Sequence, residues 1–257
     1  MKITILVNRD LPALLALNYL LPRLTEHRVR VFYTHKTPVN NLPTALQPLA
    51  NFERQLLLQM DASANRNKLL NLDQLGRYTC ANITRLNSVN SIDFAKLQQT
   101  QPDLIVSIRH MTILQKDVIK LPKLGVINLH SGLLPSYQGV MSTFRAMLNK
   151  EAMLGSTLHF IEDQSIDSGA IIARAPIVMH SNKSYFWNVL NLYDQGCQLI
   201  QNAINSLASE QTLTSICQHG PARYYSYPVQ QDVIEFAAQG FKLFEVDDLN
   251  DFRIELS

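Results

Sequence analysis

Hydrophobic residues in the first half of the chain fall into short blocks that alternate between strand and helix patterns. Residues 2–7 favour a strand, and after the polar triplet Asn8-Arg9-Asp10 an apolar helical pattern covers residues 11–24, with Pro12 suited to the first helical turn. The same alternation predicts a strand at 29–34, a helix at 42–60 interrupted near Pro48, a short helix at 92–99, a strand at 103–107, a helix at 115–120 and a strand at 125–129.

This alternation predicts the fold class. Strands separated by helices form a mostly parallel, Rossmann-like α/β sheet with helices on both faces, and ligands bind beyond the carboxyl ends of the strands. No GxGxxG sequence follows the first strand, and no GxxxxGK[ST] loop is present. Hydride transfer from a dinucleotide and phosphoryl transfer from a nucleoside triphosphate therefore lose their main support.

The pattern changes after Gly155. Residues 156–161 and 170–178 are expected to be strands joined through an acidic loop, and residues 184–207 a long amphipathic helix that Ser184 caps. From Gln211 the chain is more polar, with a short strand expected at 222–227 and a helix at 230–239. These patterns divide the chain into one large domain, residues 1–208, and a small C-terminal extension, residues 209–257.

Composition narrows the class of protein. A chain of 257 residues with 46% hydrophobic and 17% charged residues can bury a core of ordinary size. The first apolar run is too short for a signal peptide, and nowhere do about 18 apolar residues follow one another, so we expect a cytoplasmic protein that does not enter membranes. The formal charge of +2 is spread along the chain, which gives no sign of a nucleic-acid partner.

The cysteines point away from disulfide and metal chemistry. Cys80, Cys197 and Cys217 are odd in number and widely spaced, and no two of them form a CxxC pair. The sequence offers no other cluster of metal ligands. We expect free thiols and no metal site.

The chemically most informative residues are Asn128 and His130, at the end of the strand expected at 125–129. Residues two apart in a strand point to the same face, so an amide donor and a titratable imidazole would project side by side at the edge of the sheet. Taken alone, this pair favours the structural interpretation, an Asn and a His that end a strand and bond to its turn.

The surrounding sequence resembles the 10-formyltetrahydrofolate-dependent formyltransferases, a family that includes sugar N-formyltransferases, methionyl-tRNA formyltransferase and glycinamide ribonucleotide transformylase. Residues 125–139 read GVINLHSGLLPSYQG and residues 155–172 read GSTLHFIEDQSIDSGAII. They contain the family pattern N-x-H, L-L-P-x-x-x-G, T-x-H and D-x-G in order. The resemblance is clear over about residues 100–180 and weaker before them.

The resemblance implies a role for three residues. Asn128 would donate a hydrogen bond to the formyl oxygen as that oxygen gains negative charge. His130 would take part in proton transfer from the attacking amine, and Asp167 would orient His130 or stabilise its charge. Asp163 lacks the D-x-G-x-I-I run that begins at Asp167. The formyl donor would be 10-formyltetrahydrofolate, and no metal is required.

The resemblance also implies a pterin-binding segment. A flat heterocycle needs main-chain groups at its rim and apolar side chains on its faces. The candidates are Met111, Thr112, Ile113 and Leu114 on one side, with Ile161, Glu162 and Asp163 on the other. A loop that only packs on the core remains open for each of them. His110 is expected to be a loop residue, whereas His159 either supports Asp167 or is a strand histidine satisfied by its neighbours.

Two features depart from the family pattern. Ser131-Gly132 stands where members of the family often have Pro-Ser or Ala-Ser, and the interval from His159 to Asp167 is one residue longer than in the purine-pathway members. The longer interval leaves the shape of the acidic loop open.

The acceptor is less constrained than the donor. The residues after the long helix are too few for the tRNA-binding barrel of the initiator-formylating enzymes and are not notably basic. Total length and the short extension favour an N-formyltransferase that acts on a primary amine of a nucleotide-linked amino sugar. The alternative acceptors are an amino acid, glycinamide ribonucleotide and methionyl-tRNA. A further alternative is that the protein binds folate without catalysis. The oligomeric state is left open, with a homodimer as one option.

Overall fold

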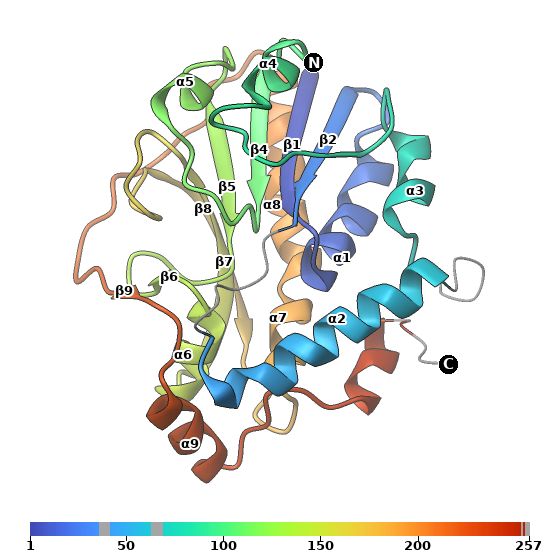
Figure 1. Cartoon of the computed structure of the whole chain (residues 1–257). Helices are drawn as coiled ribbons and strands as arrows, with labels where there is room; N and C mark the ends of the chain where they lie inside the picture. Colours follow the sequence, from blue (N-terminus) through green and yellow to red (C-terminus); the bar gives the residue numbers. More distant parts are fainter. Residues whose placement is uncertain (36–41, 63–68, 253, 255–257) are drawn as a thin grey trace.

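The computed structural model describes residues 1–35, 42–62, 69–252 and 254, with residues 61 and 62 described in their backbone alone. At its centre is a seven-stranded sheet in the order β3-β2-β1-β4-β5-β7-β8 (Figure 1). The strands are β1 (Lys2–Asn8), β2 (Arg28–Thr34), β3 (Thr84–Arg85), β4 (Leu104–Ile108), β5 (Val126–His130), β7 (Met153–Phe160) and β8 (Ile171–Val178). Strands β1 to β5 are parallel, and β7 runs antiparallel to both of its neighbours. The mostly parallel sheet expected from the sequence is confirmed.

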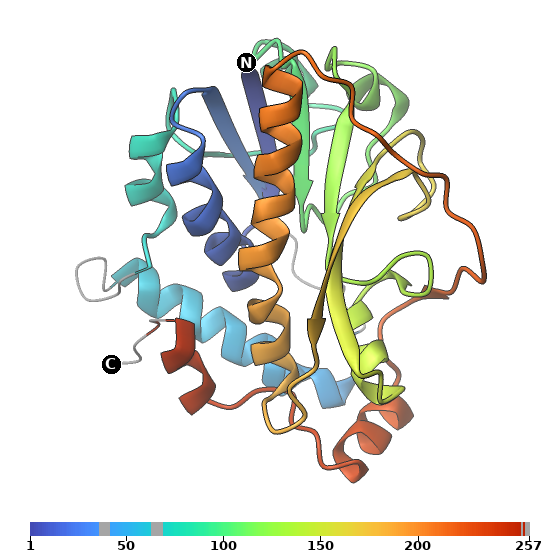
Figure 2. The ribbon, with the colours of Figure 1, turned by 180° about the vertical axis from the view of Figure 1, so that it is seen from behind.

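Helices lie on both faces of this sheet. Helices α1 and α8 lie across one face (Figure 2), and α4 and α5 lie on the other (Figure 1). The described helices are α1 (Leu11–Leu20), α2 (Gln47–Ala62), α3 (Leu72–Leu75), α4 (Phe94–Gln98), α5 (Lys116–Ile119), α6 (Ser142–Leu148), α7 (Tyr185–Asn191), α8 (Tyr193–Ala208) and α9 (Gln230–Ala238), with short 3-10 turns at Leu21–Arg23, Thr44–Leu46, Gly76–Tyr78 and Asp247–Phe252.

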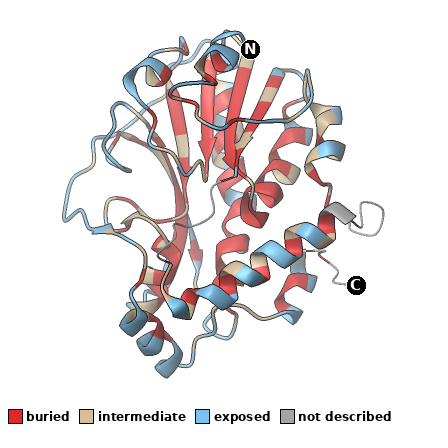
Figure 3. Ribbon diagram, in the orientation of Figure 1, coloured by how far each residue is buried: buried red, intermediate tan, exposed pale blue. Residues whose placement is uncertain are grey.

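The hydrophobic core follows from the alternation of side chains along β1. Ile3 and Ile5 point into the larger apolar cluster, beneath α1 and α8. Leu6 points to the opposite face, where it packs with Phe32 and Ile105 in a second, smaller cluster. Because both faces are covered, the central strands are buried almost throughout, whereas the outer turns of α2 and α9 face solvent (Figure 3).

Three elements differ from the sequence expectation. The helix expected at 184–207 is two helices, α7 and α8, which meet at Leu192. Pro48 does not interrupt a helix, because α2 begins at Gln47 and the proline lies in the first turn, where no backbone N–H is needed. Helix α6 was missed altogether: five of its seven residues are buried, so its sequence shows no amphipathic stripe.

The C-terminal extension packs back onto the large domain. Phe236 of α9 stacks on Phe144 of α6 with 4.4 Å between ring centroids, and Phe244 stacks on Phe52 of α2 at 4.2 Å. The short strands β6 (Gln138–Gly139) and β9 (Tyr224–Tyr225) pair with each other. A boundary near residue 208 stays a prediction, and residues 253 and 255–257 of the extension lie outside the described part.

Within the described ranges, no helix combines the length and apolar character needed to span a membrane. All three cysteines are free thiols, with Cys197 buried under α1 and Cys80 and Cys217 exposed.

Candidate functional site

A cleft of about 340 Å³ opens at the carboxyl ends of β4 and β5. This is the edge at which open α/β sheets bind ligands. Its walls come from α2, from the loops after β4 and β5, from the β7–β8 loop and from the C-terminal extension. The three residues expected to be catalytic, Asn128, His130 and Asp167, all line it.

Strand pairing brings the two histidine-containing motifs together. In the antiparallel register of β5 and β7, Asn128 lies opposite His159 and His130 lies opposite Thr157. Residues that are opposite each other in a sheet point to the same face. The N-x-H and T-x-H sequences therefore form one block of side chains, although 27 residues of chain separate His130 from Thr157.

Asp167 comes to this block from the loop between β7 and β8. Its φ of 52° is in the left-handed region, which is costly for a residue other than glycine. The Gly139 N–H donates to its Oδ2 at 2.9 Å, and the side-chain amides of Gln138 and Gln218 donate to its carbonyl oxygen at 3.2 and 2.7 Å. The longer interval before Asp167 therefore does not remove it from the site.

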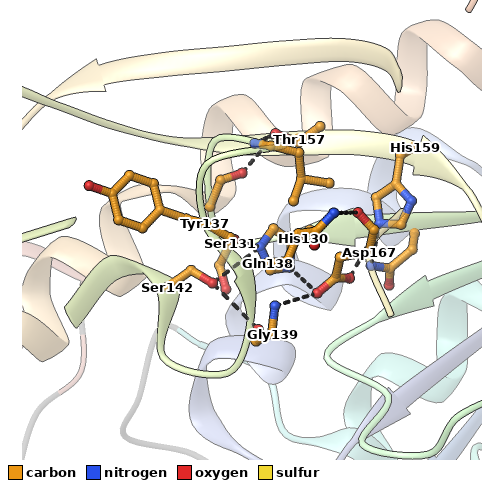
Figure 4. A network of polar contacts seen from close by, with 12 residues as sticks. His130, Ser131, Tyr137, Gln138, Gly139, Ser142, Thr157, His159 and Asp167 are labelled. Atoms are coloured by element: carbon orange, nitrogen blue, oxygen red, sulfur yellow. Dashed lines mark hydrogen bonds and ion pairs between the residues drawn. The ribbon is translucent and has the colours of Figure 1, made fainter. Parts of the chain in front are cut away.

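His130 is fixed at both ring nitrogens (Figure 4). Its Nε2 lies 2.7 Å from the Tyr137 carbonyl oxygen and 3.2 Å from Ser142 Oγ, and its Nδ1 lies 3.3 Å from Asp167 Oδ2. A carbonyl oxygen can only accept, so Nε2 carries a hydrogen and donates it to Tyr137. In the neutral ring this leaves Nδ1, beside the carboxylate, as the atom that can take up a proton.

Burial and charge set the protonation of this pair. Burial lowers the pKa of His130, and the nearby Asp167 opposes this only in part. Burial raises the pKa of Asp167, but His130, His159 and the Gly139 N–H outweigh it, so the pKa of Asp167 falls to about 2. At neutral pH the site thus combines a neutral imidazole with a carboxylate, the arrangement that a general base needs.

His159 holds the Asn128 amide. Its Nδ1–H donates to the Phe160 carbonyl oxygen at 2.8 Å, so in the neutral ring Nε2 can accept from Asn128 Nδ2 at 3.1 Å. The same Nε2 lies 3.5 Å from Asp167 Oδ1. One N–H of the Asn128 amide is thereby oriented, and the other remains for a ligand. Two roles were expected for His159, support of Asp167 or a strand histidine satisfied by its neighbours, and its contacts fit both.

The residues expected to hold the pterin form one side of the cleft, with one exception. Those that line it are Met111, Thr112, Ile113, Leu114, Ile161 and Asp163. Glu162 is not in the wall, and its carboxylate accepts instead from the Ala170 N–H at 3.0 Å, which closes the acidic loop. His110 lies in the cleft wall, in the loop after β4.

The pterin-side loop has a support that sequence reasoning missed. The Asn90 side chain donates to the Ile113 carbonyl oxygen at 2.8 Å and accepts from the Gln115 N–H at 2.9 Å. A lone asparagine more than 20 residues away carries no local signal of this contact.

Further residues, outside the expected catalytic and pterin-binding sets, also line the cleft. Glu53 of α2, Arg109 at the end of β4, Tyr185 of α7 and Tyr227 of the extension all line it. Arg109 has a φ of 54°, so this position, like Asp167, holds a non-glycine residue in the left-handed region. No motif joins these four residues, because they meet only through the fold.

Among the residues that the structure describes, no group of three or more histidine, cysteine, aspartate or glutamate side chains is arranged to hold a metal ion.

The glycine that departs from the family pattern has a structural reason. A Cβ at Gly132 would lie 2.7 Å from His130 Nε2 and 2.9 Å from the Tyr137 carbonyl oxygen. We expect Gly132→Ala to displace the imidazole and lower kcat by about 10-fold or more, since small misplacements of reacting groups are costly. The matched control is Gly76→Ala, because nothing lies within 4 Å of its Cβ. Steady-state kinetics on both folded variants test this, and equal kcat values would contradict it.

Comparison with known proteins agrees with the geometry. Residues 80–185 match the family model described as formyl transferase. A methionyl-tRNA formyltransferase from Fusobacterium nucleatum is 29% identical over 150 residues, which are 57% of this chain and 48% of that protein. The chain thus spans about half the length of the curated relatives it matches.

Solved structures share the fold at low identity. A 4-N formyltransferase from Francisella tularensis matches with a TM-score of 0.59 and 14% identity, over 91% of this chain and 86% of that one. An N-formyltransferase from Helicobacter canadensis, solved with folinic acid and dTDP-3-aminofucose, matches with a TM-score of 0.55 and 20% identity, over 90% of this chain and 70% of that one. Residues 80–185 of this chain are thus similar to the formyl transferase family, and the sheet and the paired motifs agree with that match.

Proposed function

We propose that this protein transfers a formyl group from 10-formyltetrahydrofolate to a primary amine, with Asn128, His130 and Asp167 as the catalytic residues. The observation that carries the proposal is the way in which the two ring nitrogens of His130 are held. Its Nε2 is committed to the Tyr137 carbonyl, and its Nδ1 faces the Asp167 carboxylate at 3.3 Å in a cleft. Such a ring accepts a proton at one defined atom.

The proposed chemistry uses this atom twice. The folate supplies a formyl group that is activated on its N10. As the amine nitrogen bonds to the formyl carbon, the free N–H of Asn128 donates to the oxygen on which negative charge develops. His130 Nδ1 takes the proton that the amine loses, and Asp167 stabilises the imidazolium. His130 then returns this proton to N10 of the folate as the bond between N10 and the formyl carbon breaks, which completes the transfer.

The wall from Met111 to Leu114 supports the donor part of the proposal. Met111 and Ile113 are apolar and exposed at the cleft, and Leu114 anchors the loop in the core. Exposed apolar side chains on a loop whose main chain is held in place suit a flat heterocycle. We propose that this wall binds the pterin, with Ile161 and Asp163 on its other side and Glu162 acting through the loop backbone.

For the acceptor we propose an amino sugar that is linked to a nucleotide. The fold neighbour with dTDP-3-aminofucose supports this class. Methionyl-tRNA, glycinamide ribonucleotide and amino acids are the alternatives. Methionyl-tRNA is among them because two curated relatives are methionyl-tRNA formyltransferases, although this chain matches only about half of their length. A binding protein without turnover is the remaining alternative, and the complete Asn128, His130 and Asp167 set argues against it.

Formation of formylated product separates these possibilities. Purified protein is given 10-formyltetrahydrofolate with dTDP-linked amino sugars, methionyl-tRNA, glycinamide ribonucleotide or free amino acids, and both formylated amine and tetrahydrofolate are measured. We expect the highest kcat/KM with an amino sugar. Faster formylation of methionyl-tRNA at equal concentration would reject the acceptor class, and donor binding without any product would reject the enzymatic proposal.

A further inference from the structure

The cleft also contains an acid and a base that form no ion pair with each other among the described residues. Glu53 comes from α2 and Arg109 from the end of β4, and both line the same cleft as His130. Among the described residues, no ion pair joins Glu53 to Arg109. A carboxyl group and a guanidinium that line one cleft without pairing can hold a ligand group that both donates and accepts.

Arg109 is held rigidly on one side. Its Nε donates to both carboxylate oxygens of Asp10, at 2.9 and 3.0 Å, and Asp10 also accepts from the Ala13 N–H at the start of α1. A guanidinium has five N–H donors, and the bonds to Asp10 use only the one on Nε. The Arg109 side chain is 24% exposed, so its Nη groups can donate into the cleft.

Glu53 is the matching acceptor. Its partly buried carboxylate receives no hydrogen bond from the described residues. Burial raises the pKa of Glu53 to about 7, although Arg109 opposes this rise. A carboxyl group that is withdrawn from water without a partner is costly, and a ligand hydroxyl removes that cost by donating to it.

Charge and shape define what fits. Glu53 and Asp10 together place two carboxylates around one guanidinium, which disfavours a diphosphate at this point. The aromatic side chains of Tyr185 and Tyr227 complete the wall and offer apolar area. A hydroxylated ring meets these requirements better than a phosphate or an amine without hydroxyl groups.

We propose that Glu53 and Arg109 recognise a ring hydroxyl of the acceptor, which donates to the Glu53 carboxylate and accepts from an Arg109 Nη group. This inference rests on the proposed function, because it assigns the hydroxyl-bearing part of the acceptor to one side of the catalytic cleft. It places the sugar ring at Glu53 and any diphosphate outside that contact. Glu53 is then a specificity residue, since a site built to bond a hydroxyl discriminates against the deoxy analogue.

The test compares a parent acceptor with its deoxy analogues, in the unaltered protein and in variants of Glu53. The probes are a dTDP-linked 3-amino sugar and a series of analogues in which each ring hydroxyl in turn is replaced by hydrogen. With the unaltered protein, replacement of one particular ring hydroxyl by hydrogen is expected to lower kcat/KM by about 10-fold or more, the usual effect of losing a hydrogen bond to a charged group. In Glu53→Ala this preference is expected to disappear, and Glu53→Gln, which keeps an acceptor oxygen, is expected to restore part of it.

The control is Glu235→Ala, a carboxylate on the exposed side of α9, which is expected to keep the full preference. If Glu53→Ala lowers kcat/KM for the parent sugar and every deoxy analogue by the same factor, Glu53 is structural and the inference is wrong. An unchanged preference would also overturn it.

Failure of the proposed function gives a different result. If the unaltered protein forms no product with any amine, binding of the same probes to the protein saturated with folinic acid is measured by calorimetry. If one deoxy sugar binds more weakly than the parent sugar to the unaltered protein, and the two bind equally to Glu53→Ala, hydroxyl recognition is supported even without turnover. Equal binding of all the sugars, or no binding, rejects it.

Discussion

Replacing His130 with alanine is expected to lower turnover by at least ~10²-fold, the usual scale for loss of a general acid or base. The imidazole provides the one atom, Nδ1, that faces both the cleft and the Asp167 carboxylate. Alanine leaves the attacking amine without a proton acceptor at that point. Binding of the folate should change little, because its proposed contacts lie on the Met111–Leu114 side.

Two measurements distinguish loss of the proton acceptor from loss of the folded structure. Thermal unfolding of His130→Ala is compared with that of the unaltered protein, and donor affinity is measured by calorimetry. His219→Ala, at an exposed position in the extension, is the matched control and should retain full turnover. A folded His130→Ala variant that keeps most of its rate would show that His130 is not the proton acceptor.

Asp167→Asn is expected to lower turnover by about 10²-fold while donor binding is preserved. Asparagine keeps the size of the side chain but removes the charge that stabilises protonated His130. Asp167 raises the pKa of His130 against the lowering by burial. Without that charge the pKa of His130 falls further, so the acid limb of the kcat profile should move to lower pH.

The same substitution has a consequence for stability. In the folded protein the pKa of Asp167 is about 2, below its ordinary value of 3.8. A carboxylate of this kind stabilises the fold above pH 3.8, and the contribution is lost as the pH falls toward 2. Acid unfolding of Asp167→Asn should therefore be less steep over that range, which circular dichroism can follow.

The controls for Asp167 separate charge from folate binding. Asp117→Asn removes an exposed carboxylate on α5 and should leave the kcat profile unchanged. If Asp167→Asn loses both donor binding and turnover, the main role of Asp167 is to bind the folate. An acid limb that moves to higher pH would contradict the proposed electrostatic role.

The sequence by itself determined the elements that carry the site. Apolar runs bounded by turns placed strands ending near Ser107 and Leu129, and period two placed Asn128 and His130 on one face. The cleft found at these strand ends was expected from the alternation of strands and helices. All of these are local properties, which nearest neighbours along the chain decide.

The tertiary structure decided which atoms meet. The register of β5 against β7 sets Asn128 opposite His159, and a shift by one residue would turn the two motifs to opposite faces. The hydrogen on His130 Nε2 depends on the Tyr137 carbonyl, a main-chain group whose direction no side-chain pattern records.

The residues proposed to bind the acceptor show no pattern in the sequence for a related reason. Glu53, Arg109 and Tyr227 come from α2, the end of β4 and the C-terminal extension, and only the fold brings them to one cleft. The extension was expected to be an appendage, yet its Gln218 bonds the Asp167 carbonyl oxygen at 2.7 Å. Periodicity along the chain reports which side of an element is buried, whereas long-range packing alone determines which elements share a cleft and which charges are left without partners.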